Sequence, residues 1–286
     1  MSASSPTPLI SIITPTYNRP DFLARALLTL TDQTCRDFEV VVVNDAGVGV
    51  EPVLERFAGK LDITYVRHGR NRDRAAARNT GLGIARGRFI AYLDDDDLYR
   101  ADHLETLVAP LLAGTHHVSC SDSTLMLEIK TPTGYQPVKV LTTRSTPFDR
   151  ERLLIANYIP ILSLMHSRTC LDDVGRFDES LRTHEDWDLF IRLSRRYEFF
   201  HVPKITADVS YREDGSSTTS ADGDDFGRTM ALIHARYRGL VQDRPEMLAR
   251  QKEALARMFG VVTPPAEPAS GDPMPSPPAP RASSGS

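Results

Sequence analysis

Short apolar runs alternate with segments of helical periodicity along the first third of the chain. The apolar runs are continuous and rich in β-branched residues, which is typical of strands buried on both faces. The predicted strands are 9–14, 38–45, 62–66 and 88–93. The predicted helices are one that begins at Pro20, one over 51–58 and one over 73–85. This alternation predicts an α/β protein with a Rossmann-like, mainly parallel sheet and right-handed crossovers.

The pattern changes after residue 112. Segments 116–130 and 135–143 predict an antiparallel pair around a turn at Pro132–Gly134. Further predicted elements are a helix near 149–157, a strand near 161–166, an amphipathic helix over 184–197, and two short strands over 199–203 and 206–212. These elements predict a smaller mixed sheet beside the parallel one.

Two helices and a tail are predicted at the C-terminus. Apolar residues from Phe226 to Leu240 recur at helical spacing, and a second helix follows Pro245 and runs to Phe259. The stretch 226–259 has seven Lys or Arg and three acids, so it could rest weakly on an anionic membrane. The alternative is that the apolar stripe from Phe226 to Leu240 packs on the rest of the protein, and the modest excess of basic over acidic residues favours it. The Pro-rich tail is expected to be disordered and could tether a further domain or partner.

Composition narrows the functional classes. The chain has 286 residues, of which 41% are hydrophobic and 25% charged, as in ordinary globular proteins. A net charge of −4 argues against nucleic-acid binding. Three distant cysteines without a CxxC pair, and no signal-peptide pattern, indicate a reduced, cytoplasmic compartment. The most apolar stretch, 153–165, is shorter than the roughly 20 residues that span a bilayer.

Polar clusters follow three of the predicted parallel strands. They are Thr14–Asn18, Asp45 and Asp94–Asp97. Because ligands of open α/β sheets bind at the carboxyl ends of the strands, we expect these clusters to meet along one edge.

The four consecutive acids of YLDDDDLY (92–99) repel one another. Turn and helix-capping chemistry accounts for one or two of them. A divalent cation, held by carboxylate and phosphate oxygens together, accounts for the whole cluster.

Four motifs in sequence order resemble those of the family 2 glycosyltransferases. They are SIITPTYNRPDFLARAL (11–27), VVVVNDAG (40–47), AAARNTGLGIARGRFIAYLDDDDLY (75–99) and GRFDESLRTHEDWDLFIRL (175–193). The resemblance covers about 9–218 and implies the GT-A fold. It also implies inverting transfer of a sugar from a nucleotide-sugar donor, by default UDP-linked, to a hydroxyl of a carbohydrate, lipid-linked or protein acceptor in polysaccharide or glycoconjugate biosynthesis.

The resemblance assigns roles on the donor side. The implied nucleotide-binding residues are Thr14, Pro15, Thr16, Tyr17, Asn18, Asp45, Arg74, Arg78, Asn79, Asp94 and Asp95. Asp96 is the implied ligand of a Mn²⁺ or Mg²⁺ cofactor. Asp97 is expected to cap a helix or to support the residues that bind the metal. The alternatives are a plain β–α loop for 14–18, a turn role for Asp45, and a solvated basic face for the two arginines and Asn79.

On the acceptor side the resemblance implies that Asp186 is the general base. The alternative is helix capping, with Thr183 as N-cap and acids in the first turn. Trp187 is expected in the core or in the acceptor site, where Glu185 is also a candidate. Asp214 stands where many relatives have a histidine; it could bind metal, or its segment could bend as a lid at Gly215.

The expected organisation places a nucleotide-sugar-binding half before the acceptor half. Its parts are a flexible N-terminus (1–8), a donor half (9–115), an acceptor and base half with the mixed sheet (116–225), C-terminal helices (226–259) and a disordered tail (260–286). The alternatives are a nucleotidyltransferase, whose Gly-rich N-terminal loop is absent, and a non-catalytic sugar-nucleotide-binding module. A phosphatase of the haloacid dehalogenase type would need a nucleophilic Asp motif where TPTYN (14–18) stands.

Overall fold

The computed structural model describes residues 7–214, 216 and 223–258. The predictions made for residues 1–6, for Gly215, for Phe259 and for the tail lie outside these described residues.

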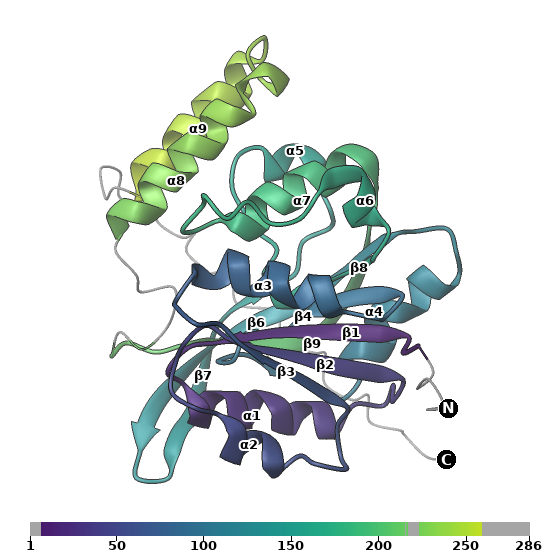
Figure 1. The fold of residues 1–286 in the computed structure, drawn as a ribbon. Helices are drawn as coiled ribbons and strands as arrows, with labels where there is room; N and C mark the ends of the chain where they lie inside the picture. Colours follow the sequence, from purple (N-terminus) through teal and green to yellow (C-terminus); the bar gives the residue numbers. More distant parts are fainter. Residues whose placement is uncertain (1–6, 215, 217–222, 259–286) are drawn as a thin grey trace, which may run out of the picture.

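One nine-stranded sheet forms the centre of the described part of the chain (Figure 1). Its strands are β1 (Ile10–Thr16), β2 (Phe38–Asn44), β3 (Ile63–Arg67), β4 (Phe89–Tyr92), β5 (Leu98–Tyr99), β6 (Val118–Thr131), β7 (Gly134–Arg144), β8 (Leu164–Ser167) and β9 (Phe199–Tyr211). The helices are α1 (Pro20–Thr31), α2 (Glu51–Glu55), α3 (Asp73–Ile84), α4 (His103–Leu112), α5 (Arg150–Leu153), α6 (Cys170–Val174), α7 (Glu185–Arg196), α8 (Gly223–Arg236) and α9 (Pro245–Met258), with 3₁₀ segments η1 (Ile161–Ser163) and η3 (Arg238–Leu240).

The parallel half has the order β3-β2-β1-β4, as the alternating pattern predicts. Successive side chains of a strand point to opposite faces of the sheet. Ile12 therefore packs with α1 and α4, whereas Ile13 packs with α3 and α7. Helices thus cover both faces, which confirms the predicted architecture and directs the polar strand ends to one edge.

The mixed half continues the same sheet instead of forming a separate one. β8 is antiparallel to β4 and to β6, β9 is parallel to β6, and the short β5 closes the path. β7 pairs with β6 in an antiparallel hairpin, as predicted.

The two short strands predicted after α7 are wrong, because β9 is one continuous strand. Its register against β6 slips between Val202 and Ile205, which leaves Pro203 and Lys204 outside the ladder. Proline has no N–H to donate to a ladder, and a bulge is a place where a sheet accommodates it. The local pattern at Pro203 therefore predicts a break where the strand only bulges.

The α8–α9 hairpin packs on α5 and α7 (Figure 1). Ile233 is buried, the Tyr237 hydroxyl donates to the Asp188 carboxylate at 2.8 Å, and the Gln251 amide donates to the Leu154 carbonyl at 2.6 Å. The expected packing of the apolar stripe is confirmed.

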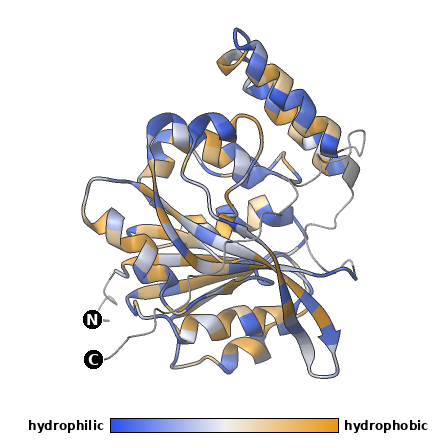
Figure 2. Ribbon diagram, turned by 180° about the vertical axis from the view of Figure 1, so that it is seen from behind, coloured by the Kyte–Doolittle hydropathy of each residue, from blue (hydrophilic) through white to orange (hydrophobic). Residues whose placement is uncertain are grey.

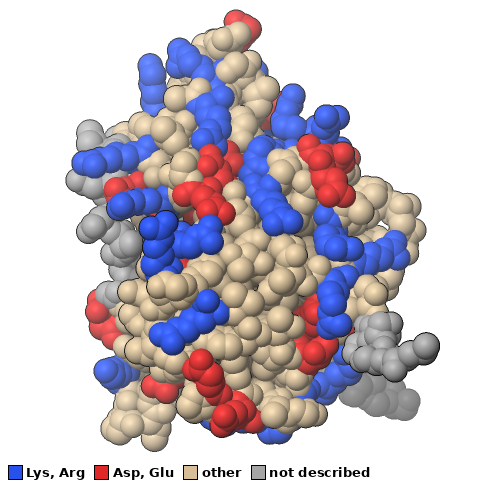
Figure 3. All heavy atoms as spheres, in the orientation of Figure 1, with Lys and Arg blue, Asp and Glu red and all other residues tan. Residues whose placement is uncertain are grey.

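The outer surface of the hairpin is mixed in character. Both helices carry hydrophobic and hydrophilic residues (Figure 2), and Lys and Arg side chains stand out over the hairpin (Figure 3). Arg236 is not merely solvated, since it forms ion pairs with Asp178 and Asp188 at 2.7 Å. Among the described helices, none is long and apolar enough to cross a bilayer. Weak membrane contact of this hairpin stays a prediction.

Replacing Ile233 with alanine should lower the free energy of unfolding by about 2–5 kcal/mol, because the change leaves a cavity between the hairpin and α7. Leu232→Ala is the matched control, since the neighbouring Leu232 is 50% exposed. Urea denaturation of both variants measures the difference. Equal midpoints for the two variants would show that the hairpin does not pack as described.

Candidate active site

A cavity of about 210 Å³ lies at the carboxyl edge of the parallel strands. Most of the residues predicted to bind the nucleotide or the metal line it: Pro15, Thr16, Tyr17, Asp45, Arg74, Arg78, Asp94, Asp95 and Asp96. The segments that follow β1, β2 and β4 meet there because these strands are neighbours in the sheet. The expected convergence of the three polar clusters is confirmed.

Three residues predicted for the nucleotide point elsewhere. Thr14 is buried inside β1, and its hydroxyl has no hydrogen-bond partner in the described structure. Asn18 has a left-handed backbone (φ 57°), and its Oδ1 accepts from the Val48 N–H at 2.9 Å. Asn79 binds both backbone groups of Phe177, at 2.9 and 3.0 Å. Asn18 and Asn79 therefore brace the loops around the cavity.

Asp45 is held rigidly at the cavity wall. Its carboxylate accepts from the Arg72 backbone N–H at 2.9 and 3.0 Å and contacts Nδ1 of His68 at 2.7 Å. The second ring nitrogen of His68 contacts the Thr80 hydroxyl at 2.9 Å, which fixes the ring. The carboxylate is thus oriented before any ligand arrives.

Three arginines form ion pairs with the acidic cluster. Arg78 donates to both oxygens of Asp94, at 2.6 and 2.9 Å. Arg19 lies 3.1 Å from Asp96, and Arg212 donates to the same oxygen of Asp96 at 2.6 Å. Arg78 is fully buried, so the solvated basic face considered for it is wrong.

Sequence reasoning missed Arg19 and Arg212. Arg19 directly follows the nucleotide loop in TPTYNRP, which is the signal that could have identified it. Arg212 belongs to the Tyr-Arg pair before Glu213, and nothing local indicates where its side chain points.

Arg212 occupies the most enclosed position of this network. Its side chain has no exposure and bridges Asp96 to Glu128, with 3.1 Å to the latter. The guanidinium also lies 4.3 Å from the centre of the Phe22 ring. Arg25 forms a second ion pair with Glu128. The acidic cluster is therefore tied to α1 and to the long β6 strand.

The arginines do not fully compensate the cluster. Burial raises the pKa of Asp95 to about 7, and the Asp96 charge adds to the rise. Burial also raises the pKa of Asp96, against the opposing effects of Arg19 and Arg212. Raised carboxyl pKa values mean that the negative charge is poorly solvated there, so a further cation would be bound favourably.

The cluster fits a metal site that a ligand completes. Both protein contacts to Asp96 go to Oδ2, and no described side chain donates to Oδ1. Among the described residues, no group of three or more His, Cys, Asp or Glu side chains is arranged to hold a metal ion alone. Mg²⁺ and similar ions are commonly held by one or two carboxylates together with substrate phosphates, which suits this geometry.

Asp97 does not line the 210 Å³ cavity. Its Oδ1 accepts from the Ser210 backbone N–H at 3.0 Å and so connects the segment just before β5 to β9. Burial raises the pKa of Asp97, and the Asp96 charge raises it further. This supporting contact is the kind of role expected for Asp97.

A second cavity, of about 300 Å³, adjoins the first and contains Asp186. The Asp186 carboxylate accepts from the Trp187 backbone N–H at 2.7 Å and from the Asn157 amide at 3.0 Å. Burial raises the pKa of Asp186 to about 6, with a further rise from Glu185 and opposition from Arg78. Asp186 is consequently oriented, ionised at neutral pH and able to take a proton.

The capping alternative for α7 is correct for the acids, since Glu185, Asp186 and Asp188 lie in the first turn, but it is wrong for the N-cap. The N-cap is His184, in the left-handed conformation with φ 57°, and Thr183 does not hold that position. The predicted helix boundary is otherwise confirmed.

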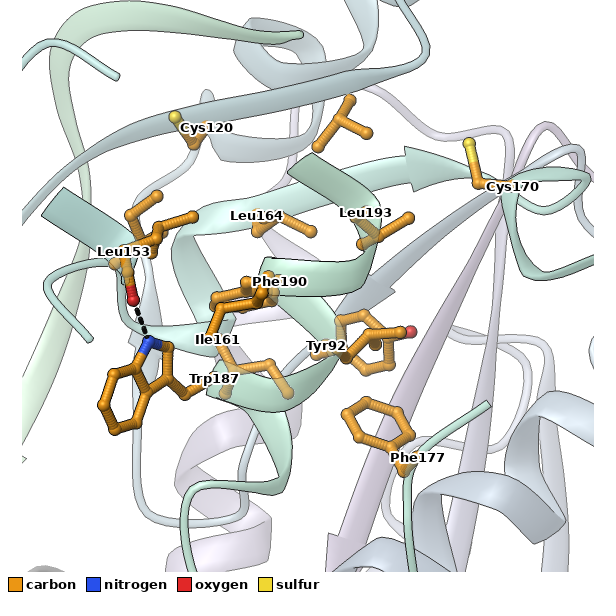
Figure 4. Packing of buried hydrophobic residues seen from close by; sticks show 14 of the residues in the cluster. Tyr92, Cys120, Leu153, Ile161, Leu164, Cys170, Phe177, Trp187, Phe190 and Leu193 are labelled. Atoms are coloured by element: carbon orange, nitrogen blue, oxygen red, sulfur yellow. Dashed lines mark hydrogen bonds between the residues drawn. The ribbon is translucent and has the colours of Figure 1, made fainter. Parts of the chain in front are cut away.

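The remaining acceptor candidates have distinct environments. Glu185 lines the 300 Å³ cavity and pairs with the buried Arg78. Trp187 is fully buried, and its indole N–H donates to the Leu153 carbonyl in the core under α7 (Figure 4). The Asp214 carboxylate accepts from the Tyr135 hydroxyl, and from the Ser216 hydroxyl at 2.6 Å. Asp214 lines neither cavity.

The two cavities share a wall. Arg74, Arg78, Asp94 and Asp96 line both of them. A molecule in the first cavity and a molecule beside Asp186 would therefore meet at the acidic cluster.

Comparison with known proteins agrees with this geometry. The model of the family "Glycosyl transferase family 2" matches residues 11–152. The uncharacterized glycosyltransferase YwdF of Bacillus subtilis is 32% identical over 211 residues, which are 74% of this chain and 77% of that protein.

Two solved structures share the fold. S. aureus TarS 1–349 in complex with UDP-GlcNAc matches with a TM-score of 0.64 and 20% identity, over 88% of this chain and 72% of that one. The mannosyltransferase PcManGT from Pyrobaculum calidifontis, in complex with GDP-Man and Mn²⁺, matches with a TM-score of 0.60 and 20% identity, over 91% and 77%. The fold is thus that of GT-A glycosyltransferases, and the chain belongs to glycosyl transferase family 2 and is a glycosyltransferase.

Proposed function

We propose that this enzyme transfers a sugar from a nucleotide-sugar donor to an acceptor hydroxyl with inversion, and that Asp186 is the general base. The observation that carries the proposal is the wall shared by the two cavities. Asp186 lines the second cavity, which meets the first at this wall, and this supports its assignment as the base that acts next to a bound donor. Residues 9–115 then provide the donor side, and 116–225 provide the base.

The donor cavity suits a nucleoside diphosphate. Asp45 offers a fixed carboxylate for hydroxyl or N–H groups of the nucleoside, and Tyr17 is 47% exposed, so its ring is available for contact. Arg19 and Arg78 line the same cavity and pair with Asp96 and Asp94, so their guanidinium groups lie where a diphosphate would meet the acids. The donors bound to TarS and PcManGT support a nucleotide sugar, with UDP as the default.

Asp96, together with Asp94 or Asp95, would hold a divalent cation, Mn²⁺ or Mg²⁺. Such a cation, when bound, offsets the negative charge of the departing diphosphate. The protein's own contribution is to orient Asp96 through Arg212 and to leave its second oxygen without a donor among the described residues.

Asp186 acts on the acceptor. Because its pKa is about 6, it is ionised at pH 7 and still basic enough to take the hydroxyl proton as the oxygen attacks. Direct displacement by that oxygen inverts the configuration at the sugar carbon. Asn157 holds the carboxylate in place through its amide.

Asp186→Asn should lower turnover of UDP-GlcNAc by roughly 10²–10⁴, since it keeps the shape and removes the base. The assay measures release of the nucleoside diphosphate from UDP-GlcNAc, and from GDP-Man as a second donor, in the presence of Mn²⁺. Proton NMR identifies the anomer of the sugar that is released first. Inversion predicts that the α-linked donor of UDP-GlcNAc yields the β anomer first. Loss of donor affinity with turnover intact would instead make Asp186 a binding residue.

Turnover should fall as the pH drops through about 6, because Asp186 then becomes protonated and cannot accept the proton. Above that pH the rate should level off. Asn157→Ala removes a hydrogen bond to the ionised form and should move the midpoint upwards, by up to about one pH unit. A pH–rate profile of both proteins measures this. An unchanged midpoint in Asn157→Ala would contradict the assignment of the profile to Asp186.

Asp96→Asn should abolish the dependence of donor affinity on Mn²⁺, because an amide is a much poorer metal ligand than a carboxylate. Calorimetric titration of UDP with Mn²⁺ or with excess chelator gives the readout. Asp97→Asn is the matched control, since Asp97 is a neighbouring buried acid outside the donor cavity. Equal metal dependence in both variants would remove Asp96 from the metal site.

A further inference from the structure

The acids that line the 300 Å³ cavity already have donors. Asp186 accepts from Asn157 and from a backbone N–H, and Asp97 accepts from the Ser210 N–H. Arg78 serves both Asp94 and Glu185. One oxygen of Glu185 has no hydrogen-bond partner in the described structure, but it is enclosed beside Arg78.

Two guanidinium groups that line this cavity, by contrast, have N–H donors without acceptors among the described residues. A guanidinium has five N–H donors and no acceptor. Arg144, the last residue of β7, lines the cavity with an exposed side chain, and no described residue accepts a hydrogen bond or forms an ion pair with it. Arg74 has a single described contact, with Glu185 at 3.6 Å, which is too long for a hydrogen bond. The cavity therefore has donors left over beside the catalytic base.

The acids near Arg144 do not use it. Burial lowers the pKa of Arg144, and the charges of Asp97 and Asp186 oppose this effect, so both acids lie within electrostatic range. Neither comes within ion-pair distance of its guanidinium in the described structure. The side chain is thus held near the site with its planar set of N–H groups open, and carboxylates and phosphates bind such a set with two parallel hydrogen bonds.

We propose that Arg144, assisted by Arg74, binds an anionic group of the acceptor, either a carboxylate or a phosphate ester, and so selects acidic acceptors. This inference rests on the proposed function, because the cavity is an acceptor site only if Asp186 is the base. The neutral hydroxyl to be glycosylated would face Asp186 while the anionic group faces Arg144, and the opposite charges at the two ends would fix the orientation.

Binding of matched probes tests the proposal without requiring turnover. Ligand-observed NMR titration compares methyl β-glucuronide and methyl β-glucoside, which differ in a carboxylate, with glucose 6-phosphate as the phosphate arm. The wild type should bind at least one anionic probe more tightly than the glucoside. Arg144→Gln should weaken that binding about 10–100-fold, the usual value of hydrogen bonds to a charged group. Arg144→Lys should lie in between, since it keeps the charge and loses the fork.

Lys139→Gln is the matched control, because Lys139 is an exposed cation on the same strand that does not line the cavity. It should leave all probe affinities unchanged. Equal affinity of wild type for neutral and anionic probes, or equal effects of Arg144→Gln and Lys139→Gln, would overturn the proposal. So would a weaker UDP affinity in Arg144→Gln with probe binding unchanged, since Arg144 would then serve the donor. Suppose that the wild type binds the anionic probes through Arg144 and still releases no UDP from donors. That result would support the anion site and contradict the proposed transfer reaction.

Discussion

Repulsion among the four aspartates that follow β4 is the constraint on which the site depends. Buried like charges are stable only when cations lie among them, and the chain brings these cations from three distant places. Arg19 precedes α1, Arg78 lies in α3, and Arg212 follows β9. The folding of both halves of the sheet is therefore required to assemble the cluster, and the cluster in turn holds the ends of these elements together.

A buried ion-pair network of this kind is weak evidence for stability, because desolvation offsets most of the attraction. Its value here is geometric. Arg212 is clamped between Asp96 and Glu128 and lies over an aromatic ring, so the oxygen of Asp96 that it binds is fixed in place. The raised pKa of Asp95 shows that compensation remains incomplete. An edge that is rigid and still short of positive charge is prepared for a cation and for the ligand that accompanies it.

The sequence predicts what depends on local periodicity and on strand ends. The strands β1 to β4, the helix carrying Arg74 and Arg78, and the placement of Asp45 beside a cavity follow from these rules, whereas only the family resemblance indicates Asp186. Asn79 shows their limit, since one residue beyond Arg78 turns a side chain about 100° around the helix and away from the cavity. The pairing of Asp96 with Arg212 spans 116 residues and that with Arg19 spans 77, and no local pattern encodes either. The same holds for β9, where only the pairing with β6 decides that Pro203 lies in a bulge.

The distribution of unsatisfied groups divides the site into two regions of opposite character. At the acidic cluster the unmet need is for positive charge, because burial raises the pKa values of Asp95 and Asp96 despite the arginines around them. In the neighbouring cavity the unmet need is for hydrogen-bond acceptors, because the Arg144 side chain has none among the described residues. Asp186 lies in this second cavity, whose wall is shared with the first. A donor drawn to the cluster with its cation and an acceptor held by an anionic group would thus be oriented independently of each other. If Asp186 is the base, it needs to contribute nothing to the binding of either, which leaves its pKa free to be set by burial and by the neighbouring Glu185 and Arg78.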